Sequence, residues 1–272
     1  MIRFIQQAIR SAGTALRRKA GGADQSVEDF ILSVGTEYEP APLPTPPMAN
    51  QGWWGQRLEY VKTPPSYVFN ESLGDYDYAR DLSIAKPTVS VGDILLINVD
   101  FMEWSGTGAP SVVTPPTGFT LIDSDVADGA DSTNHVAQFL YGRVIDGSEG
   151  STFSVTGSAG IEWTRMFCLV VTGGSALGAA NSWNGGPWTL ARRLPGITTT
   201  EDNSLVLAFT NCWDADVGSP RPSGWTEAGD IGDQMIMFSK VVTTAGAIGN
   251  TDYDETDLWT LRTAVTVEIR PA

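Results

Sequence analysis

The spacing of apolar residues at the start of the chain predicts an amphipathic helix. Apolar side chains recur every three or four residues, so a helix would gather them on one face. These positions are Ile2, Ile5, Ile9, Ala12 and Leu16. Gly21 and Gly22 then form a stop signal, and Ser26 resembles the cap of a second short helix. We therefore assign residues 1–35 to a helical N-terminal segment.

A proline-rich stretch follows this segment. Residues 36–51 contain the run EPAPLPTPP, whose prolines exclude a helix and favour an extended spacer. The remaining residues, 52–272, make up the body of the protein. The pattern thus predicts three parts: a helical segment, a stiff linker and a folded body.

From about residue 85 onward, strand-length apolar runs occur twice in the same order. GDILLINVDF (from 92) matches DNSLVLAFTN (from 202), and PPTGFT (115–120) matches RPSGWT (221–226). FLYGRVI (139–145) matches IMFSKVV (236–242), and WTRMFCLVV (163–171) matches WTLRTAVTV (259–267). Four matches in one order indicate an internal repeat, over residues 85–172 and 197–271.

Each repeat offers four strands with one apolar face. Such a sheet cannot stand alone in water, but two of them can bury their apolar faces against each other. The sequence therefore predicts an all-β protein: a jelly-roll-like β-sandwich built from two four-stranded repeats. Gly118 and Gly224 occupy the same place in the two Pro-x-Gly-aromatic-Thr phrases, where we expect the same backbone bend.

Charge is spread unevenly along the chain. The formal net charge is −15, and residues 1–22 contribute +5, so the rest of the chain carries −20. An acidic body argues against nucleic acid as a partner, because binding phosphates requires a basic face. The apolar runs are too short to span a membrane, and no secretory signal is evident at the N-terminus. We expect a protein made in the cytoplasm.

Candidate chemistry is sparse. The single histidine, His135, has no counterpart in the second half and no nucleophile motif beside it, so we interpret it as a surface histidine. Cys168 and Cys212 lie in apolar runs, as buried free thiols do, without metal-ligand spacing. Acidic loops near Asp125 and Asp254 lack EF-hand spacing and fit either calcium binding or simple solubility. We predict no enzymatic activity, catalytic residue, metal or cofactor.

Four tryptophans have no equivalent in the other half of the repeat. They are Trp53, Trp54, Trp183 and Trp188. A residue needed for the core of each repeat would recur, so these four are candidates for a contact surface. That surface would face another subunit, making the protein a homo-oligomer, or a glycan.

The repeated runs resemble a β-sandwich module of tailed-bacteriophage virion proteins, found in tail fibres, tail-tip proteins and head decorations. The resemblance covers about residues 85–271 and is carried by the PPTGFT turn with FLYGRVI, and by PRPSGWTEAGD with FSKVVTTAGAIG. It implies a non-enzymatic virion structural protein, a tail-associated appendage or capsid decoration, displayed on the exterior of the particle. Its partners would be other virion proteins.

The N-terminal helix would then dock into the particle. Its docking residues would be Ile2, Arg3, Ile5, Ile9, Arg10, Leu16, Arg17 and Arg18. A helix lying on a membrane and an organelle-targeting segment are alternatives, but the small alanines on its apolar face favour docking to a protein groove. For the body, the alternatives are a carbohydrate-binding module that attaches to host-surface glycan and, third, an esterase or glycosidase.

Overall fold

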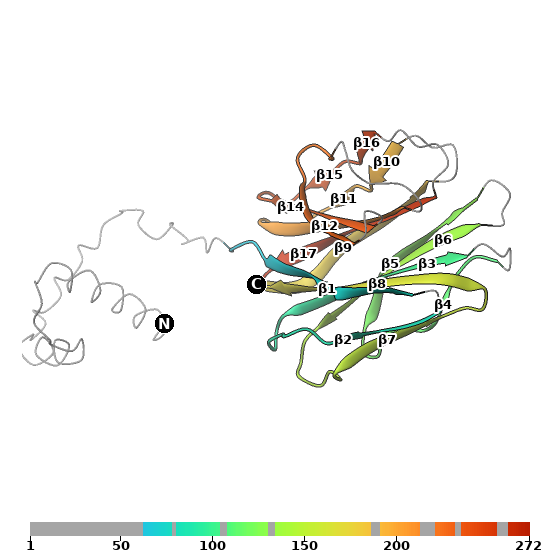
Figure 1. Cartoon of the computed structure of the whole chain (residues 1–272). Coiled ribbons are helices and arrows are strands. Elements are labelled where there is room, and N and C mark those ends of the chain that lie inside the picture. Colours follow the sequence, from blue (N-terminus) through green and yellow to red (C-terminus); the bar gives the residue numbers. More distant parts are fainter. Residues whose placement is uncertain are drawn as a thin grey trace, which may run out of the picture. The chain divides into compact units, whose positions relative to one another are not determined.

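The computed structural model describes residues 62–77, 80–103, 108–129, 134–185, 191–212, 221–231, 235–254 and 261–272 (Figure 1). The predicted helical segment, with its docking residues, and the proline-rich spacer lie outside these residues. So do Trp53, Trp54 and Trp188. Within the described residues every regular element is a strand, which confirms the all-β prediction.

The first half of the described chain forms two sheets. Its strands are β1 (Ser66–Asp77), β2 (Asp81–Ala85), β3 (Ile94–Glu103), β4 (Val112–Thr114), β5 (Thr120–Asp128), β6 (His135–Val144), β7 (Thr152–Gly157) and β8 (Ile161–Thr172). Five of them form a main sheet in the order β1-β8-β3-β6-β5, and the other three form a small sheet in the order β2-β7-β4.

The second half repeats this plan. Its strands are β9 (Gly174–Gly185), β10 (Ala191–Leu194), β11 (Ile197–Thr198), β12 (Ser204–Cys212), β13 (Thr226–Ile231), β14 (Met235–Val242), β15 (Ala247–Ile248), β16 (Thr251–Asp254) and β17 (Arg262–Pro271). The main sheet has the order β13-β14-β12-β17-β9. The pairs β10–β16 and β11–β15 cover it and share one register, since Leu194 pairs with Thr251 and Ile197 with Ile248.

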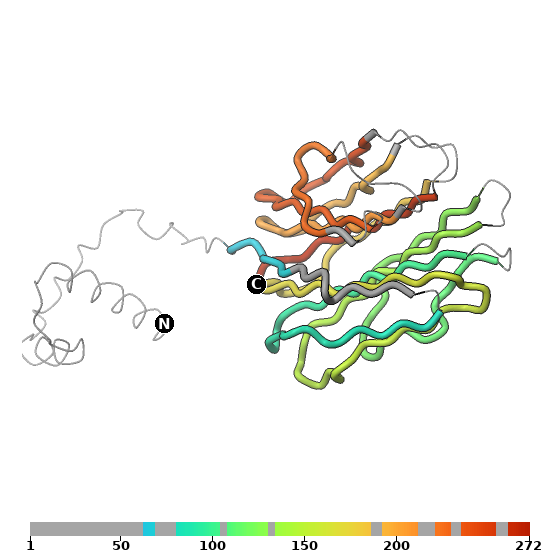
Figure 2. Tube along the Cα trace, in the orientation of Figure 1, coloured from blue at the N-terminus to red at the C-terminus, as the bar shows by residue number. Residues whose placement is uncertain are grey.

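The two main sheets have the same strand order. The order β8-β3-β6-β5 in the first half corresponds to β17-β12-β14-β13 in the second, with β1 and β9 as equivalent edge strands. The prediction of four strands in each half is wrong, because each main sheet has five strands and a smaller sheet covers it. Each repeat therefore begins earlier than predicted, with β1 and β9 rather than at residues 85 and 197. Figure 2 shows the halves as two consecutive blocks of chain.

The glycine turns of the two halves have the same geometry. Gly118 and Gly224 have φ values of 81° and 78°, which only glycine adopts without strain. The amides of Phe119 and Trp225 donate to the carbonyls three residues before them, at 3.1 and 3.3 Å. The turns lead into β5 and β13. Each of these strands has a β-bulge after its second paired residue, Leu121 in β5 and Glu227 in β13.

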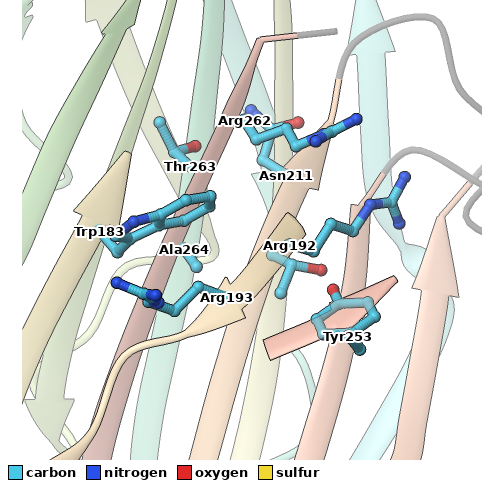
Figure 3. Close-up of a pocket in the computed structure, with 9 residues that line it drawn as sticks. Trp183, Arg192, Arg193, Asn211, Tyr253, Arg262, Thr263 and Ala264 are labelled. Atoms are coloured by element: carbon cyan, nitrogen blue, oxygen red, sulfur yellow. The ribbon is translucent and has the colours of Figure 1, made fainter. Parts of the chain in front are cut away.

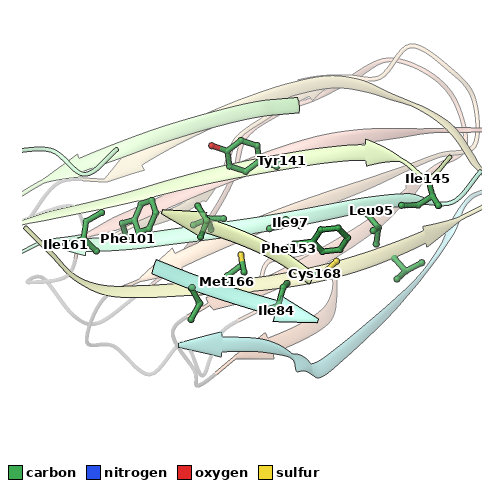
Figure 4. Packing of buried hydrophobic residues seen from close by; sticks show 14 residues of the cluster. Ile84, Leu95, Ile97, Phe101, Tyr141, Ile145, Phe153, Ile161, Met166 and Cys168 are labelled. Carbon is green, nitrogen blue, oxygen red and sulfur yellow. The ribbon is translucent and has the colours of Figure 1, made fainter. Parts of the chain in front are cut away.

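Three of the four apolar clusters among the described residues lie between the sheets, and the fourth, smaller one surrounds Met102 and Val136. The central core joins the two main sheets, and Phe167 and Phe209 meet there with ring centroids 5.6 Å apart. A second core lies between the first main sheet and β2-β7-β4 (Figure 4). A third, smaller core lies under β10 and β16, around Phe238 and Tyr253. The main sheets therefore pack face to face as expected, but each also buries its other face.

Burial on both faces explains an error in the sequence match. The match equates Leu95 with Leu205, yet Leu95 lies in the outer core of the first half and Leu205 in the central core. Ile94 and Leu205 are the equivalent residues, one position away. All ten residues of β3 are buried, so its apolar run has no alternation that could define the register.

Polar side chains cross the central core and link the two main sheets. Arg165 forms a buried ion pair with Asp100, at 2.5 Å, and donates to the amide oxygen of Asn211 at 2.6 Å. Asn211 in turn donates to Asp100. Nearby, the Gln138 amide donates to the side chain of Asn98 and to the Phe209 carbonyl of the opposite sheet. These directional bonds fix how one sheet sits on the other.

Burial raises the pKa of Asp100 from 3.8 to about 6, although Arg165 and Asn211 act in the opposite direction. A raised pKa in the folded state contributes stability at low pH that is lost as the pH rises through that pKa. At neutral pH the Asp100 carboxylate is charged, and the guanidinium of Arg165 compensates this buried negative charge.

Replacing Arg165 with methionine tests this dependence. The R165M variant should lose about 3–5 kcal/mol of unfolding free energy near neutral pH, because a buried charge is left uncompensated. Without Arg165 the pKa of Asp100 rises further, so acidification to about pH 5 should recover part of the loss. Urea unfolding at both pH values measures the effect. The D100N/R165M variant should be more stable than R165M at neutral pH, and equal stability of R165M and wild type would contradict the assignment.

Glu268 on β17 joins three segments of the second half. Its buried carboxylate accepts hydrogen bonds from the backbone amides of Ala179 and Thr200, at 3.2 and 2.8 Å, and from the Ser204 hydroxyl at 2.8 Å. Burial acts to raise the pKa of Glu268, but these hydrogen bonds outweigh it and lower the pKa below its usual 4.5. A lowered pKa contributes stability above the unfolded-state value and loses it as the pH falls.

The E268Q variant should therefore unfold about 3 kcal/mol more easily at neutral pH, because an amide group would face these donors. The difference from wild type should shrink below pH 4.5, the ordinary pKa of a glutamate, as the native carboxylate protonates. Thermal and urea unfolding across pH measure it. E162Q, a change at an exposed position of β8, is the matched control and should have no effect. A constant difference down to acid pH would contradict the assignment.

Candidate functional site

The candidate site is a cleft in the second half, between the main sheet and β10 with β16. It is lined by Trp183, Arg192, Arg193, Thr210, Asn211, Tyr253, Arg262, Thr263 and Ala264 (Figure 3). Its enclosed part, about 10 Å³, has room for about one water molecule. A ligand would thus lie across the mouth of the cleft rather than inside it.

Trp183 and a charged pair form the mouth. The partly exposed indole of Trp183 comes from β9, and the guanidinium of Arg193 lies 6.0 Å from its ring centroid. Arg193 pairs with Asp252 of β16 through two hydrogen bonds of 2.6 and 2.9 Å. Asp252 is half exposed, with 48% of its side chain accessible. An aromatic ring, a donor group and an acceptor group thus lie side by side at the surface.

Their mutual hydrogen bonds keep both members of this pair charged. The Asp252 contact raises the pKa of Arg193, and the Arg193 contact lowers the pKa of Asp252. The register of β10 and β16 produces the pair, because Arg193 and Asp252 are cross-strand partners. Opposite charges directly across an antiparallel ladder stabilise the pairing of the two strands.

Two more arginines lie deeper in the cleft. Arg192 and Arg262 are buried, with 3% and 1% of their surfaces exposed. The guanidinium of Arg192 is 6.0 Å from the Tyr253 ring centroid. Both arginines also interact with other groups, so neither guanidinium is free.

A shallow groove lies further along β9. It has a volume of about 390 Å³ and is lined by Ala179, Ala180, Asn181, Gly196, Ile197, Thr198, Ala247, Ile248, Gly249 and Asn250. The side chain of Asn181, two residues before Trp183 on the same strand face, donates to the Gly196 carbonyl at 2.9 Å. Asn250 accepts the Gly196 amide at 2.8 Å. The groove and the cleft therefore share one wall, formed by β9.

Of the four tryptophans without a repeat equivalent, the described residues include Trp183, which lies at the cleft. The sequence did not single out Arg192, Arg193, Tyr253, Asp252 or Arg262. The adjacent pair Arg192–Arg193 in the long connection between the repeats was the available signal. The pairing of β10 with β16, which joins this connection to a segment 60 residues later, could not be read from it.

His135 is not a surface histidine, which corrects the interpretation from sequence. It is 6% exposed, and its Nδ1 lies 2.8 Å from the Asp128 carboxylate, an acid seven residues earlier. The β5–β6 hairpin brings the two together. Cys168 is a buried free thiol as predicted, and burial raises its pKa to about 12. The side chain of Cys212 is not among those that the structure describes.

Acidic residues on β5 serve local structure. Asp123 and Asp125 each accept the amide of the next residue, at 2.8 Å. Asp125 also accepts a hydrogen bond from Asn184 of β9 at 2.6 Å, which links the two halves. Within the described residues, no group of three or more potential ligands could hold a metal ion.

The search for a membrane-spanning helix among the described residues finds none of sufficient length and apolar character. In comparisons with protein-family models, curated proteins and solved structures, nothing matches this chain.

Proposed function

We propose that the chain is a non-enzymatic structural protein of a tailed-bacteriophage particle, in which residues 1–35 dock to other virion proteins and the acidic β body faces outward. The observation that carries this proposal is the duplicated stack of sheets, with both main sheets buried on both faces. Such packing gives a rigid body that keeps its form when displayed on a particle. The contrast between a basic N-terminus and an acidic body supports the same orientation.

The strand order supports a jelly-roll interpretation of the first half. The two packed sheets of the first half contain β1-β8-β3-β6 and β2-β7-β4. From β1 to β4 the chain alternates between these sheets, and β5 then extends the main sheet beside β6. Eight strands in two sheets are typical of jelly rolls, which serve repeatedly as capsid domains. Fold alone does not establish function, so the location of the protein needs a direct test.

The first described residue of the body is held by contacts to the second half. Lys62, where the described body begins, forms an ion pair with Glu201 and donates to the Pro271 carbonyl at 3.4 Å. We expect several copies of the chain in one particle.

Carbohydrate binding is the second candidate function, and the Trp183 cleft favours it. Flat aromatic rings beside paired donors and acceptors suit sugars, which combine apolar ring faces with hydroxyl groups. Attachment to a glycan on the host surface would be compatible with outward display. It would also be compatible with a carbohydrate-binding module outside any particle.

Immunogold labelling of purified particles tests the structural role. Antibodies against the body should label intact particles made by the virus whose genome encodes the chain, because the body is exposed on them. Chain that copurifies with no particle, or labelling that requires disrupted particles, would overturn the proposal.

The anchor is tested by incorporation. The R3S/R10S/R17S/R18S variant removes the docking cations and should be lost from particles while its thermal unfolding stays as in wild type. R80S changes an exposed arginine of the body, with 56% of the side chain accessible, and is the control that should still incorporate. Normal incorporation of the fourfold variant would show that the anchor lies elsewhere.

A further inference from the structure

The ladder that covers the first main sheet is continuous, whereas the corresponding ladder of the second half is split. All residues of β2 pair with β7, and the amide of Lys86, the next residue, extends this ladder by donating to the Ser151 carbonyl at 2.9 Å. In the second half the ladder is divided into β10–β16 and β11–β15, which share one register. Residues 195–196 and 249–250 lie between the two parts. Two rungs have therefore opened in a ladder that is otherwise equivalent.

Particular residues hold these rungs open. Pro195 has no amide hydrogen that it could donate to a ladder. The Gly196 amide donates to the side chain of Asn250 at 2.8 Å, and the Gly196 carbonyl accepts from the side chain of Asn181 at 2.9 Å. A Cβ at residue 196 would lie less than 3.0 Å from the backbone of residues 248–250, so only glycine fits there. Side-chain amides thus take the place of the strand partner, and the opening is built into the structure.

The shallow groove along β9 lies over this opening. Its volume of about 390 Å³ is in the range of small-molecule sites, which is about 300–1,000 Å³. Among the described residues that line the groove, none has a charged side chain, although the whole chain has a formal charge of −15. The groove therefore suits an uncharged ligand.

We propose that this groove binds an uncharged oligosaccharide, with one sugar unit over the open rungs and the next unit at Trp183. This inference rests on the second candidate function, and it places the main binding surface in the groove rather than in the cleft. It does not depend on the virion location, so the two can fail separately.

The polar groups of the groove match the hydroxyl groups of a sugar. A hydroxyl group both donates and accepts, and a side-chain amide has both a carbonyl oxygen and an NH₂ group. The bonds to Gly196 use the NH₂ group of Asn181 and the carbonyl oxygen of Asn250, and both asparagines are exposed. Each amide therefore offers its other end to a ligand, while its bond to Gly196 holds it in place. Groups fixed in this way before binding lose little freedom when the ligand arrives.

The apolar surfaces beside these amides match the faces of sugar rings. Ala179, Ala247 and Gly249 have at most a methyl side chain, so a ring can approach the backbone of the groove closely. Trp183 is partly exposed and lies two residues beyond Asn181 on the same face of β9, a distance of about 7 Å along a strand. A ligand of linked rings can therefore contact the amides and the indole together. An uncharged peptide, which would bond to open backbone groups without needing the indole, is the alternative that the test includes.

Isothermal titration of the full chain tests the proposal. The neutral probes are cellohexaose, maltohexaose and laminarihexaose, the charged probe is trigalacturonate, and the peptide probe is an alanine–serine peptide capped at both ends. Wild type should bind at least one neutral probe with a Kd below about 1 mM. It should bind the charged probe and the peptide at least about tenfold more weakly.

The G249F variant fills the groove without disturbing the fold. Nothing lies within 4 Å of a Cβ at Gly249, so the new ring fits and takes up space that the ligand needs. The variant should bind the neutral probe at least about tenfold more weakly, while its thermal unfolding stays as in wild type. G246F is the matched control, because a Cβ at Gly246 is equally free and this residue is not among those that line the groove. It should bind as wild type does.

Several results would overturn the proposal. They are wild type that binds none of the neutral probes, equal or tighter binding of trigalacturonate or the peptide, equal loss in G246F and G249F, and wild-type affinity in G249F. W183A should also weaken binding, because it removes the ring beside the groove. A loss in W183A without a loss in G249F would keep carbohydrate binding at the cleft as the second candidate function and overturn only its placement in the groove. Particle labelling is unaffected by any of these outcomes.

Discussion

Burial of the two main sheets against each other is the constraint on which the rest of the structure depends. Fourteen buried side chains from both sheets form the central core, and the equivalent strands of each repeat contribute to it. Because a sheet has two faces, using one of them in this core leaves the other to be covered separately. The small sheet β2-β7-β4 covers the first main sheet, and the pairs β10–β16 and β11–β15 cover the second, which is why each half has more than one sheet.

The central core also contains groups that apolar packing would not require. Asp100, Arg165 and Asn211 form a buried cluster that spans the two sheets, and Gln138 reaches a backbone carbonyl on the opposite side. Apolar surfaces can slide over one another at little cost, whereas these bonds are satisfied in one arrangement only. The cluster thus gives the interface its specificity, and the outer faces remain free to change.

The two halves differ most on their outer faces. Among the described residues, the apolar outer core of the first half contains fourteen buried residues and that of the second half five, with Arg192 beside Tyr253. The outer faces take no part in the central core, so they can differ between the halves without changing it. The sequence pointed to part of this layer through Trp183, which has no counterpart in the repeat. It did not reveal the arginines, because their importance depends on strands that pair across sixty residues.

The sequence by itself determined the all-β class, the duplication and the two glycine turns, because all three depend on local chemistry: apolar runs of strand length, and a positive φ that glycine accepts. Tertiary structure alone decided the register of the repeats, the burial of His135 and the position of the cleft. Strands buried on both faces lack the alternation of apolar and exposed polar residues, so their pattern cannot indicate which residue faces which core. Only the packing of each sheet between two neighbours resolves it.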